Sequence, residues 1–289
     1  MTGSGENRHP YHGQRAVLST KHGKERVVAP ALMAGVGLVV EVADNLDTDA
    51  LGTFTGEIPR VGTMREVAVR KARLGMAAAR LPLGLASEGS FGPHPLVPFV
   101  PGDRELLVLV DDQLGIEVAE EALSMDTNFA HRTATERDDL GEFLRRVRFP
   151  SHGLIVRPSA GPKEPLFKGI TTVPALREAL ERCARASDDG LAHVETDMRA
   201  HMNPMRQAVI GDLAQRLGRR LRARCSRCGA PGWGRVDVIR GLPCELCGFE
   251  TDEVREEVEG CPRCDLRLTR PRSDGRTHVK AENCPVCNP

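Results

Sequence analysis

The sequence has few aromatic residues and no excess of either charge. Phe, Trp and Tyr make up 3% of its 289 residues, with one Trp and one Tyr, so we expect an aliphatic core. Lys and Arg together number 40, as do Asp and Glu. This balance argues against a strongly basic nucleic-acid binder and against electrostatic attachment to a membrane. No apolar run approaches the ~20 residues that a membrane span needs.

The N-terminal residues, MTGSGENRHPYHGQ, lack the charged and then apolar segments of a signal peptide. We expect residues 1–14 to form a disordered leader and the protein to be cytoplasmic, where cysteines stay reduced. The length favours one large domain or two. We predict an α/β domain over residues 15–221 and a small cysteine module over residues 222–289.

Cysteine placement is the most informative feature of the chain. Eight of the nine cysteines follow Arg224, in four C-x-x-C pairs: Cys225 and Cys228, Cys244 and Cys247, Cys261 and Cys264, Cys284 and Cys287. Each pair can present two sulfurs to one ion, and two pairs complete the tetrahedral site that Zn²⁺ prefers. The gaps between pairs agree with the ~15–20 residues typical of four-cysteine zinc sites. We therefore predict a double zinc ribbon with two structural zinc ions.

The pairing of the four C-x-x-C pairs is open on the sequence. The simplest arrangement places the first four cysteines on one ion and the last four on the other. The interleaved arrangement joins the first pair to the third and the second to the fourth. A disulfide framework or a redox-active pair is disfavoured by the four repeats and the missing secretion signal. The remaining cysteine, Cys183, lies in a helical pattern and is predicted to be a small core residue.

The surroundings of the cysteines leave the partner of the module open. Arginines precede the first pair and follow the third, which suits RNA, and zinc ribbons also bind proteins. The segment TDEVREEVEG between them is strongly acidic, and stacking groups are scarce beyond Trp233 and Phe249. A solvated charged surface is therefore the leading interpretation, with an RNA or protein partner as the alternative.

Strand-like and helix-like segments alternate from Arg15 to about Gly169, which predicts an α/β domain with a mixed sheet. Short apolar runs predict strands at AVLST, GLVVEVA and LGLAS. Between the second and third, TMREVAVRKARLGMAAARL predicts a helix that begins with a capping box of Thr63 and Glu66. The segment ELLVLVDDQLGIEVAEEAL then predicts a hairpin.

Polar residues follow each of the first three predicted strands, at the edge where ligands bind in α/β domains. The first strand runs into STKHGKE, whose hydroxyls and helix start can hold a phosphate. The second leads to Asp47 and Asp49, and the third is predicted to end at Ser87–Ser90. Carboxylates beside a phosphate site are what Mg²⁺ needs. Glu88 is the most telling of them, because a buried carboxylate is costly unless something compensates it.

Three segments resemble motifs of the inosine/xanthosine triphosphate pyrophosphatases, especially the non-canonical purine phosphatase branch. STKHGK is similar to the family's S/T-x-N-x-x-K phosphate turn, EVAVRKA to its E-N-A-x-x-K-A helix, and GLASEGS to its strand with an acid before Gly or Ser. The motifs keep the family's order over Arg15–Ser124, and a hairpin follows as in the family. Lys21 and Val67 stand where the family has asparagine.

The resemblance implies a role for each matching residue. Ser19, Thr20, Lys24 and Lys71 would bind phosphate, and Glu88 with Asp47 or Asp49 would hold Mg²⁺ and orient water. Further groups from the second half of the chain would complete the pocket: His152, Glu195, Asp197 and Arg199. The competing interpretations are ordinary ones: helix capping by Ser19 and Thr20, and solvent exposure of Lys71.

The whole chain also resembles a bacterial family known only as a domain of unknown function. The resemblance rests on HGKE, FTGEIPR, ASEGSFGPHP, FPSHG, ETDMRA and GLPCELCG, and it implies no activity. Our leading hypothesis is a Mg²⁺-dependent phosphohydrolase acting on a nucleotide or another phosphorylated metabolite, with structural zinc ribbons. The alternatives are a non-catalytic sensor of a phosphorylated ligand, an RNA- or protein-binding zinc protein, and a scaffold with inert strand ends.

Overall fold

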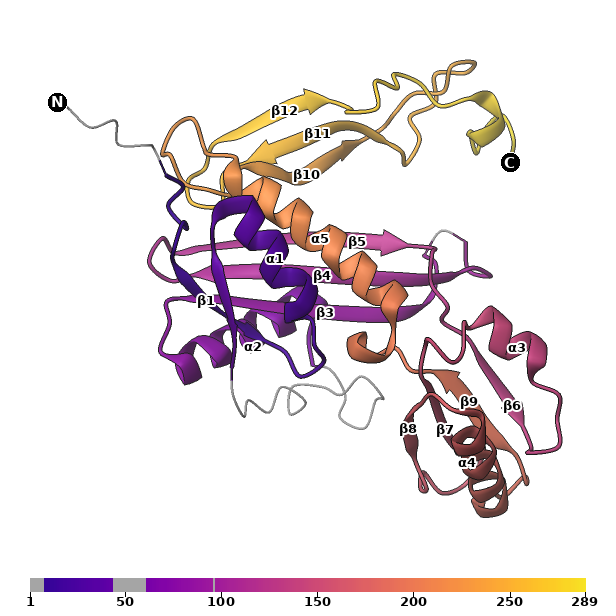
Figure 1. Cartoon of the computed structure of the whole chain (residues 1–289). Helices are drawn as coiled ribbons and strands as arrows, with labels where there is room; N and C mark the ends of the chain where they lie inside the picture. The colour runs from indigo at the N-terminus through magenta and orange to yellow at the C-terminus, as the bar shows by residue number, and fades with distance from the viewer. Residues whose placement is uncertain (1–7, 44–60, 96) are drawn as a thin grey trace.

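The computed structural model describes residues 8–43, 61–95 and 97–289, which form three β-sheets with five α-helices around them (Figure 1). The mixed α/β fold class predicted from the sequence is confirmed. In chain order the elements are β1 (Arg15–Ser19), α1 (Glu25–Val36), β2 (Val39–Val42), α2 (Met64–Ala79), β3 (Leu83–Pro93), β4 (Pro101–Asp111), β5 (Ile116–Ser124), β6 (His131–Ala134), α3 (Gly141–Arg146), β7 (Leu154–Pro158), β8 (Phe167–Ile170), α4 (Val173–Ala186), β9 (Ala192–Thr196), α5 (Pro204–Arg222), β10 (Gly234–Arg240), β11 (Val254–Gly260) and β12 (Arg267–Pro271), with 3₁₀ turns at Ala200–Met202 and Ala281–Asn283.

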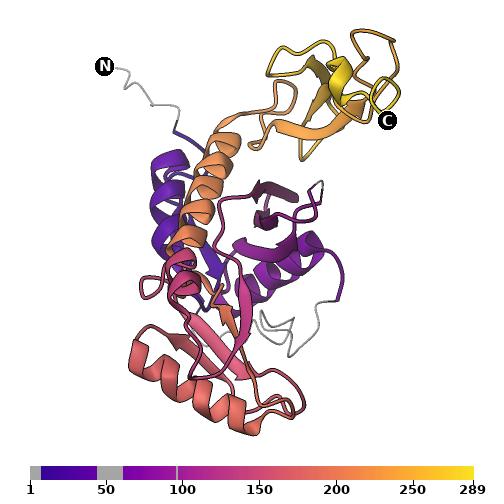
Figure 2. The ribbon, with the colours of Figure 1, turned by 90° about the vertical axis from the view of Figure 1, so that its right-hand side faces the viewer.

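The first sheet has the strand order β2-β1-β3-β4-β5. Its strands β2, β1 and β3 are parallel. Strand β4 is antiparallel to β3, and β5 is antiparallel to β4. Helices α1 and α5 cover one face and α2 covers the other (Figure 2). The buried hydrophobic side chains on both faces are aliphatic apart from Tyr11, as the scarcity of aromatics predicts.

Local sequence signals set the ends of these elements. The predicted capping box is present, because the Thr63 hydroxyl accepts from the Glu66 N–H and the Glu66 carboxylate accepts from the Thr63 N–H. The predicted hairpin is also confirmed as β4 and β5. Its turn is held by Asp111, whose carboxylate accepts from the N–H groups of Gln113 and Leu114, and by Gly115 at φ 64°.

The described part of the N-terminal segment packs against the first sheet. Residues 1–14 were predicted to be a leader, but the Tyr11 side chain is buried in the core of the first sheet. Its hydroxyl donates to the Asp111 carboxylate at 2.9 Å, and burial together with this carboxylate raises its pKa. His9 bonds the Leu221 carbonyl at the end of α5. The buried Tyr11 ring and these hydrogen bonds together hold this polar segment against the first sheet.

The second sheet, with the order β6-β9-β7-β8, is entirely antiparallel and has its own core under α4. Cys183 lies in this core, as predicted. The sheet is inserted between β5 and α5, and the chain returns through Asn203, whose amide donates to Asn128 at 2.8 Å. The sequence did not indicate that these strands form a separate sheet, because β6 (HRTA) has no apolar pattern.

The third sheet carries the cysteines. Its strands β10, β11 and β12 form an antiparallel meander that lies beyond the end of α5 (Figure 1). Many of their side chains are charged and nearly all are exposed or half-buried, so the apolar periodicity that signals a strand is weak here. No helix in the described ranges has the length and apolar character required to cross a membrane.

Candidate functional site

The eight clustered cysteines form two four-sulfur groups, each suited to one metal ion. Cys225, Cys228, Cys261 and Cys264 make the first group, and Cys244, Cys247, Cys284 and Cys287 the second. Sulfur–sulfur distances are 3.6 and 3.7 Å in the first group and 3.7 and 3.8 Å in the second. Four sulfurs placed tetrahedrally at about 2.3 Å from a zinc ion lie about 3.8 Å apart, whereas a disulfide needs about 2.05 Å.

The pairing is interleaved, so the consecutive arrangement favoured by the sequence is wrong. The reason is the register of β10 and β11, in which Gly234 at the start of β10 is opposite Gly260 at the end of β11. The first C-x-x-C pair precedes β10 and the third follows β11, so both lie at one end of the sheet. The second and fourth lie at the other end, where Cys244 bridges to Val279.

Backbone geometry around the cysteines favours thiolates, the form that binds metal. Although burial acts to raise its pKa, N–H groups of Cys228 and Arg227 lower the pKa of Cys225 to about 6. The N–H groups of Cys247 and Leu246 lower the pKa of Cys244 to about 7. Within the same group, hydrogen bonding with the Cys247 sulfur and burial raise the pKa of Cys287 to about 12.

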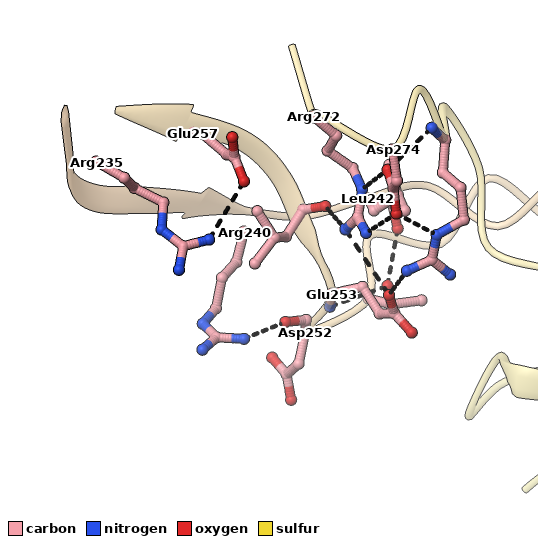
Figure 3. Close-up of polar contacts among 11 residues, drawn as sticks. Arg235, Arg240, Leu242, Asp252, Glu253, Glu257, Arg272 and Asp274 are labelled. Atoms are coloured by element: carbon pink, nitrogen blue, oxygen red, sulfur yellow. Dashed lines mark hydrogen bonds and ion pairs between the residues drawn. The ribbon is translucent and has the colours of Figure 1, made fainter. Parts of the chain in front are cut away.

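Between the two sulfur groups, the module is held by arginines rather than by a large apolar core (Figure 3). Arg272 donates to Asp274 at 2.5 and 2.8 Å and to the Val254 carbonyl at 2.5 Å. These bonds hold the pKa of Asp274 far below its usual range. Arg240 donates to the Asp252 carbonyl at 2.5 Å. Exposed ion pairs contribute little stability each, so these pairs by themselves stabilise the module only weakly.

A second candidate site is a buried polar cluster on the α2 side of the first sheet. The Lys71 ammonium lies 2.6 Å from the Glu88 carboxylate, and both side chains are about nine-tenths buried. The Ser19 hydroxyl donates to the Lys71 carbonyl at 2.7 Å. Gly75 makes this approach of β1 to α2 feasible, because a Cβ there would collide with Ser19. Three residues predicted from separate motifs therefore meet at one place.

Glu88 does not end its strand, contrary to the sequence prediction. β3 continues to Pro93, because the long strand β4 pairs with it throughout, with Leu106 opposite Glu88. The parallel partner β1 stops earlier, and its last pair with β3 is Ser19 with Ala86. Glu88 thus lies just beyond the parallel part of the sheet, where the backbone edge of β3 is open to other groups.

Lys24 occupies that open edge. Its ammonium donates to the Ser87 carbonyl at 2.9 Å and to the Ser87 hydroxyl at 3.3 Å. Burial and the nearby Arg206 lower the pKa of Lys24 to about 8, with Glu105 and Glu88 opposing the shift. Lys24 therefore keeps its charge at neutral pH, next to the pair formed by Lys71 and Glu88.

The opposite face of β3 and β4 carries a buried charged group that the sequence analysis missed. Arg206 from α5 donates to the Glu105 carboxylate at 2.5 Å, and both side chains are at most 3% exposed. Gly89 makes room for them, since a Cβ there would collide with both side chains. Asp103 lies beside Glu105 on β4 and is also buried. The signal available in the sequence was the pair of acids immediately before the apolar run LLVLV.

Asp103 provides a pH-dependent contribution to stability. Burial and the neighbouring Glu105 carboxylate raise its pKa from 3.8 to about 7, with Arg206 and Lys24 opposing the shift. The folded state binds the proton of the Asp103 carboxyl more tightly than the unfolded state does. The contribution of Asp103 to the free energy of unfolding is therefore present below pH 3.8 and is lost as the pH rises through about 7. We expect Asp103→Asn to flatten the decline in unfolding free energy across this window, measured by urea denaturation. An unchanged pH profile would contradict the assignment.

The other sequence-predicted residues are dispersed. Thr20 accepts from the His22 N–H, and Arg199 forms a bidentate pair with the buried Asp197 at 2.5–3.1 Å. His152 accepts from the Met205 N–H, and Glu195 pairs with His193. The segment of Arg199 nevertheless contacts the loop that follows β1, because the rings of His201 and His22 stack at 5.2 Å. Asp47 and Asp49 lie outside the described residues.

The fold and the geometry of the cysteine sulfurs define the class of protein. It is an α/β protein that carries a cross-braced module with two four-cysteine groups. The chain belongs to the family described as "Domain of unknown function (DUF6671)", whose model matches residues 71–289. This match begins within α2 and includes both cysteine groups. No curated protein matches the chain.

Proposed function

We propose that the first sheet forms the site of a Mg²⁺-dependent phosphohydrolase that acts on a nucleotide or another phosphorylated metabolite. The observation that carries the proposal is the meeting of Lys24, Lys71 and Glu88 where the parallel strands β1 and β3 part. Strand ends of this kind are the usual ligand-binding edge of α/β sheets. Two ammonium groups suit phosphate oxygens, and Glu88 supplies the carboxylate that Mg²⁺ takes in addition to those oxygens.

The surroundings of this cluster support the same proposal. The hairpin that follows the three motifs is present as β4 and β5, as the resemblance to the triphosphate pyrophosphatases implies. The 3₁₀ turn Ala200–Met202, which follows the second sheet, contacts the loop between β1 and α1 through the stacked rings of His201 and His22. In this arrangement Lys24 and Lys71 bind phosphate, and Glu88 holds the ion. When bound, Mg²⁺ supplies charge neutralisation for the leaving phosphate.

The test is phosphate and pyrophosphate release with Mg²⁺ across a panel of nucleotides and sugar phosphates. We expect wild type to hydrolyse at least one compound, and Glu88→Gln to lower that rate at least about a hundredfold. Glu121→Gln is the matched control, because Glu121 lies exposed on β5, where it pairs with Arg104 of β4. Equal background release of phosphate and pyrophosphate from all three proteins would refute the proposed phosphohydrolase activity. Saturable binding of a panel compound without turnover favours a sensor of the same ligand.

For the cysteine module, we propose that both groups hold structural Zn²⁺. Four thiolates close the coordination sphere, so neither ion has an open position for substrate. A reducing compartment such as the cytoplasm keeps the eight thiols free for metal. We further propose that the module contributes a surface for a macromolecular partner, RNA or protein.

A further inference from the structure

A cleft of about 900 Å³ separates the first sheet from the cysteine module. It is lined by α2, β5 and α5 on one side and by the module on the other. We call it the arginine cleft, because five arginines face two carboxylates in its lining: Arg65, Arg73, Arg220, Arg235 and Arg267, with Glu117 and Asp237. Since the whole chain has no net charge, positive charge is concentrated here.

The five arginines of the cleft differ in how far nearby carboxylates compensate their charge. Arg73 pairs with Asp112 at 2.6 Å, and Arg235 pairs with Glu257 at 3.2 Å (Figure 3). Arg220 pairs with Glu120 at 3.1 Å and also donates to the Ala119 carbonyl at 2.7 Å. Arg65 and Arg267 are exposed and form no ion pair within the part of the chain that the structure describes. One lies on α2 and the other on β12, so each wall presents an exposed guanidinium.

Glycines in the module make room for two of these side chains. A Cβ at Gly260 would collide with the Arg267 guanidinium, and a Cβ at Gly234 would lie 3.2 Å from Arg220 Nε. These glycines are opposite each other in the pairing of β10 with β11. The positions of the arginines therefore depend on the local sequence of the module as well as on its fold.

We propose that the arginine cleft binds the phosphate backbone of a single-stranded nucleic acid. Arg65 and Arg73 are eight residues apart on α2, a rise of about 12 Å, which is longer than one phosphate group. A chain of phosphates can contact several of the arginines at once. The cleft volume is that of a small-molecule pocket, so a single strand enters and a duplex does not.

The rest of the lining indicates how the strand is recognised. Its apolar part is aliphatic, with Ile116, Val236, Val258 and Pro262, and has no ring on which bases can stack. Contacts to phosphate position a strand without reading its sequence. Binding is therefore sequence-independent and strongly dependent on salt. Cys261 also lines the cleft, so metal in the first cysteine group positions one wall.

The test is fluorescence anisotropy of the full chain with a labelled homopolymeric uridine oligonucleotide over a range of salt concentrations. We expect the affinity to fall with salt, with a logarithmic slope of about −0.7 for each phosphate neutralised. Arg65→Glu combined with Arg267→Glu is expected to lower the affinity at least about tenfold and to reduce that slope. The matched control is Arg137→Glu combined with Arg177→Glu, which reverses two exposed charges far from the cleft.

The cleft variant and the control variant carry the same net charge. Equal affinities of the two for the oligonucleotide would therefore show that the arginine cleft is not the binding site. Wild type without affinity at low salt would overturn the proposal altogether. Competition by a duplex or by a free nucleoside triphosphate as strong as by the oligonucleotide would overturn the single-strand assignment. This inference extends the proposed partner surface of the module and is independent of the phosphohydrolase. Retention of an oligonucleotide and release of phosphate are separate measurements, so either proposal can fail alone.

Discussion

Replacing the first and third C-x-x-C pairs by serine is expected to leave one metal ion per chain, whereas replacing the first and second pairs leaves none. The first variant removes one complete group and keeps Cys244, Cys247, Cys284 and Cys287 together. The second removes half of each group, and the remaining pairs lie at opposite ends of the sheet formed by β10, β11 and β12. Each lost site removes a binding free energy of about 10–16 kcal/mol for zinc.

Both variants contain four serines, so each is the composition-matched control of the other. The measurement is metal content per chain after competition with a chelator. Consecutive pairing would give the opposite result, with one ion retained in the second variant. Cys183→Ser is a further control, because Cys183 lies in the core of the second sheet and should leave both ions bound. A metal content of zero in wild type would refute the metal sites themselves.

Arg206→Met is expected to lower the free energy of unfolding by about 3–5 kcal/mol, the largest effect of a single substitution that we anticipate. Glu105 is fully buried and bonded to Arg206, so loss of the guanidinium leaves a buried carboxylate without its charge partner. Asp103 lies beside it and is also buried. The penalty comes from this uncompensated charge rather than from the lost methylene contacts.

The control for Arg206→Met is Arg182→Met, because Arg182 forms an exposed pair with Glu178 at 3.4 Å and should cost at most about 0.5 kcal/mol. Adding Glu105→Gln to Arg206→Met should recover part of the loss. Urea unfolding should be followed by far-ultraviolet circular dichroism, since the one tryptophan, Trp233, lies in the cysteine module. Equal effects of the two arginine substitutions would show that the buried pair contributes no more than an exposed one.

Local signals allowed much of the first sheet to be predicted. Apolar runs, the capping box at Thr63 and the turn after Asp111 each act within a few residues, and the structure contains the elements they predict. The polar cluster was accessible for a related reason. Residues near the carboxyl ends of neighbouring parallel strands lie at the same edge of a sheet, so Ser19 and Glu88, which both contact Lys71, could be grouped from the sequence.

Features that depend on contacts between distant segments were not accessible in this way. Arg206 and Glu105 are separated by 101 positions, and nothing local to either indicates the other. That the short strands of the second sheet form a sheet of their own escaped prediction, because this depends on their pairing with one another. The end of β3 was misplaced because Gly89 and Gly92 suggest a turn, whereas pairing with β4 continues to Pro93.

The sequence by itself determined that this protein carries eight cysteines in four pairs suited to metal, attached to an α/β domain with polar strand ends. Spacing within a C-x-x-C pair is a local property, because two sulfurs two residues apart share one turn of backbone. Only the tertiary structure decided which pairs share an ion and which charged residues meet. The antiparallel register of β10 and β11 determines which C-x-x-C pairs share an ion. The packing of α5 on β4 brings Arg206 to Glu105.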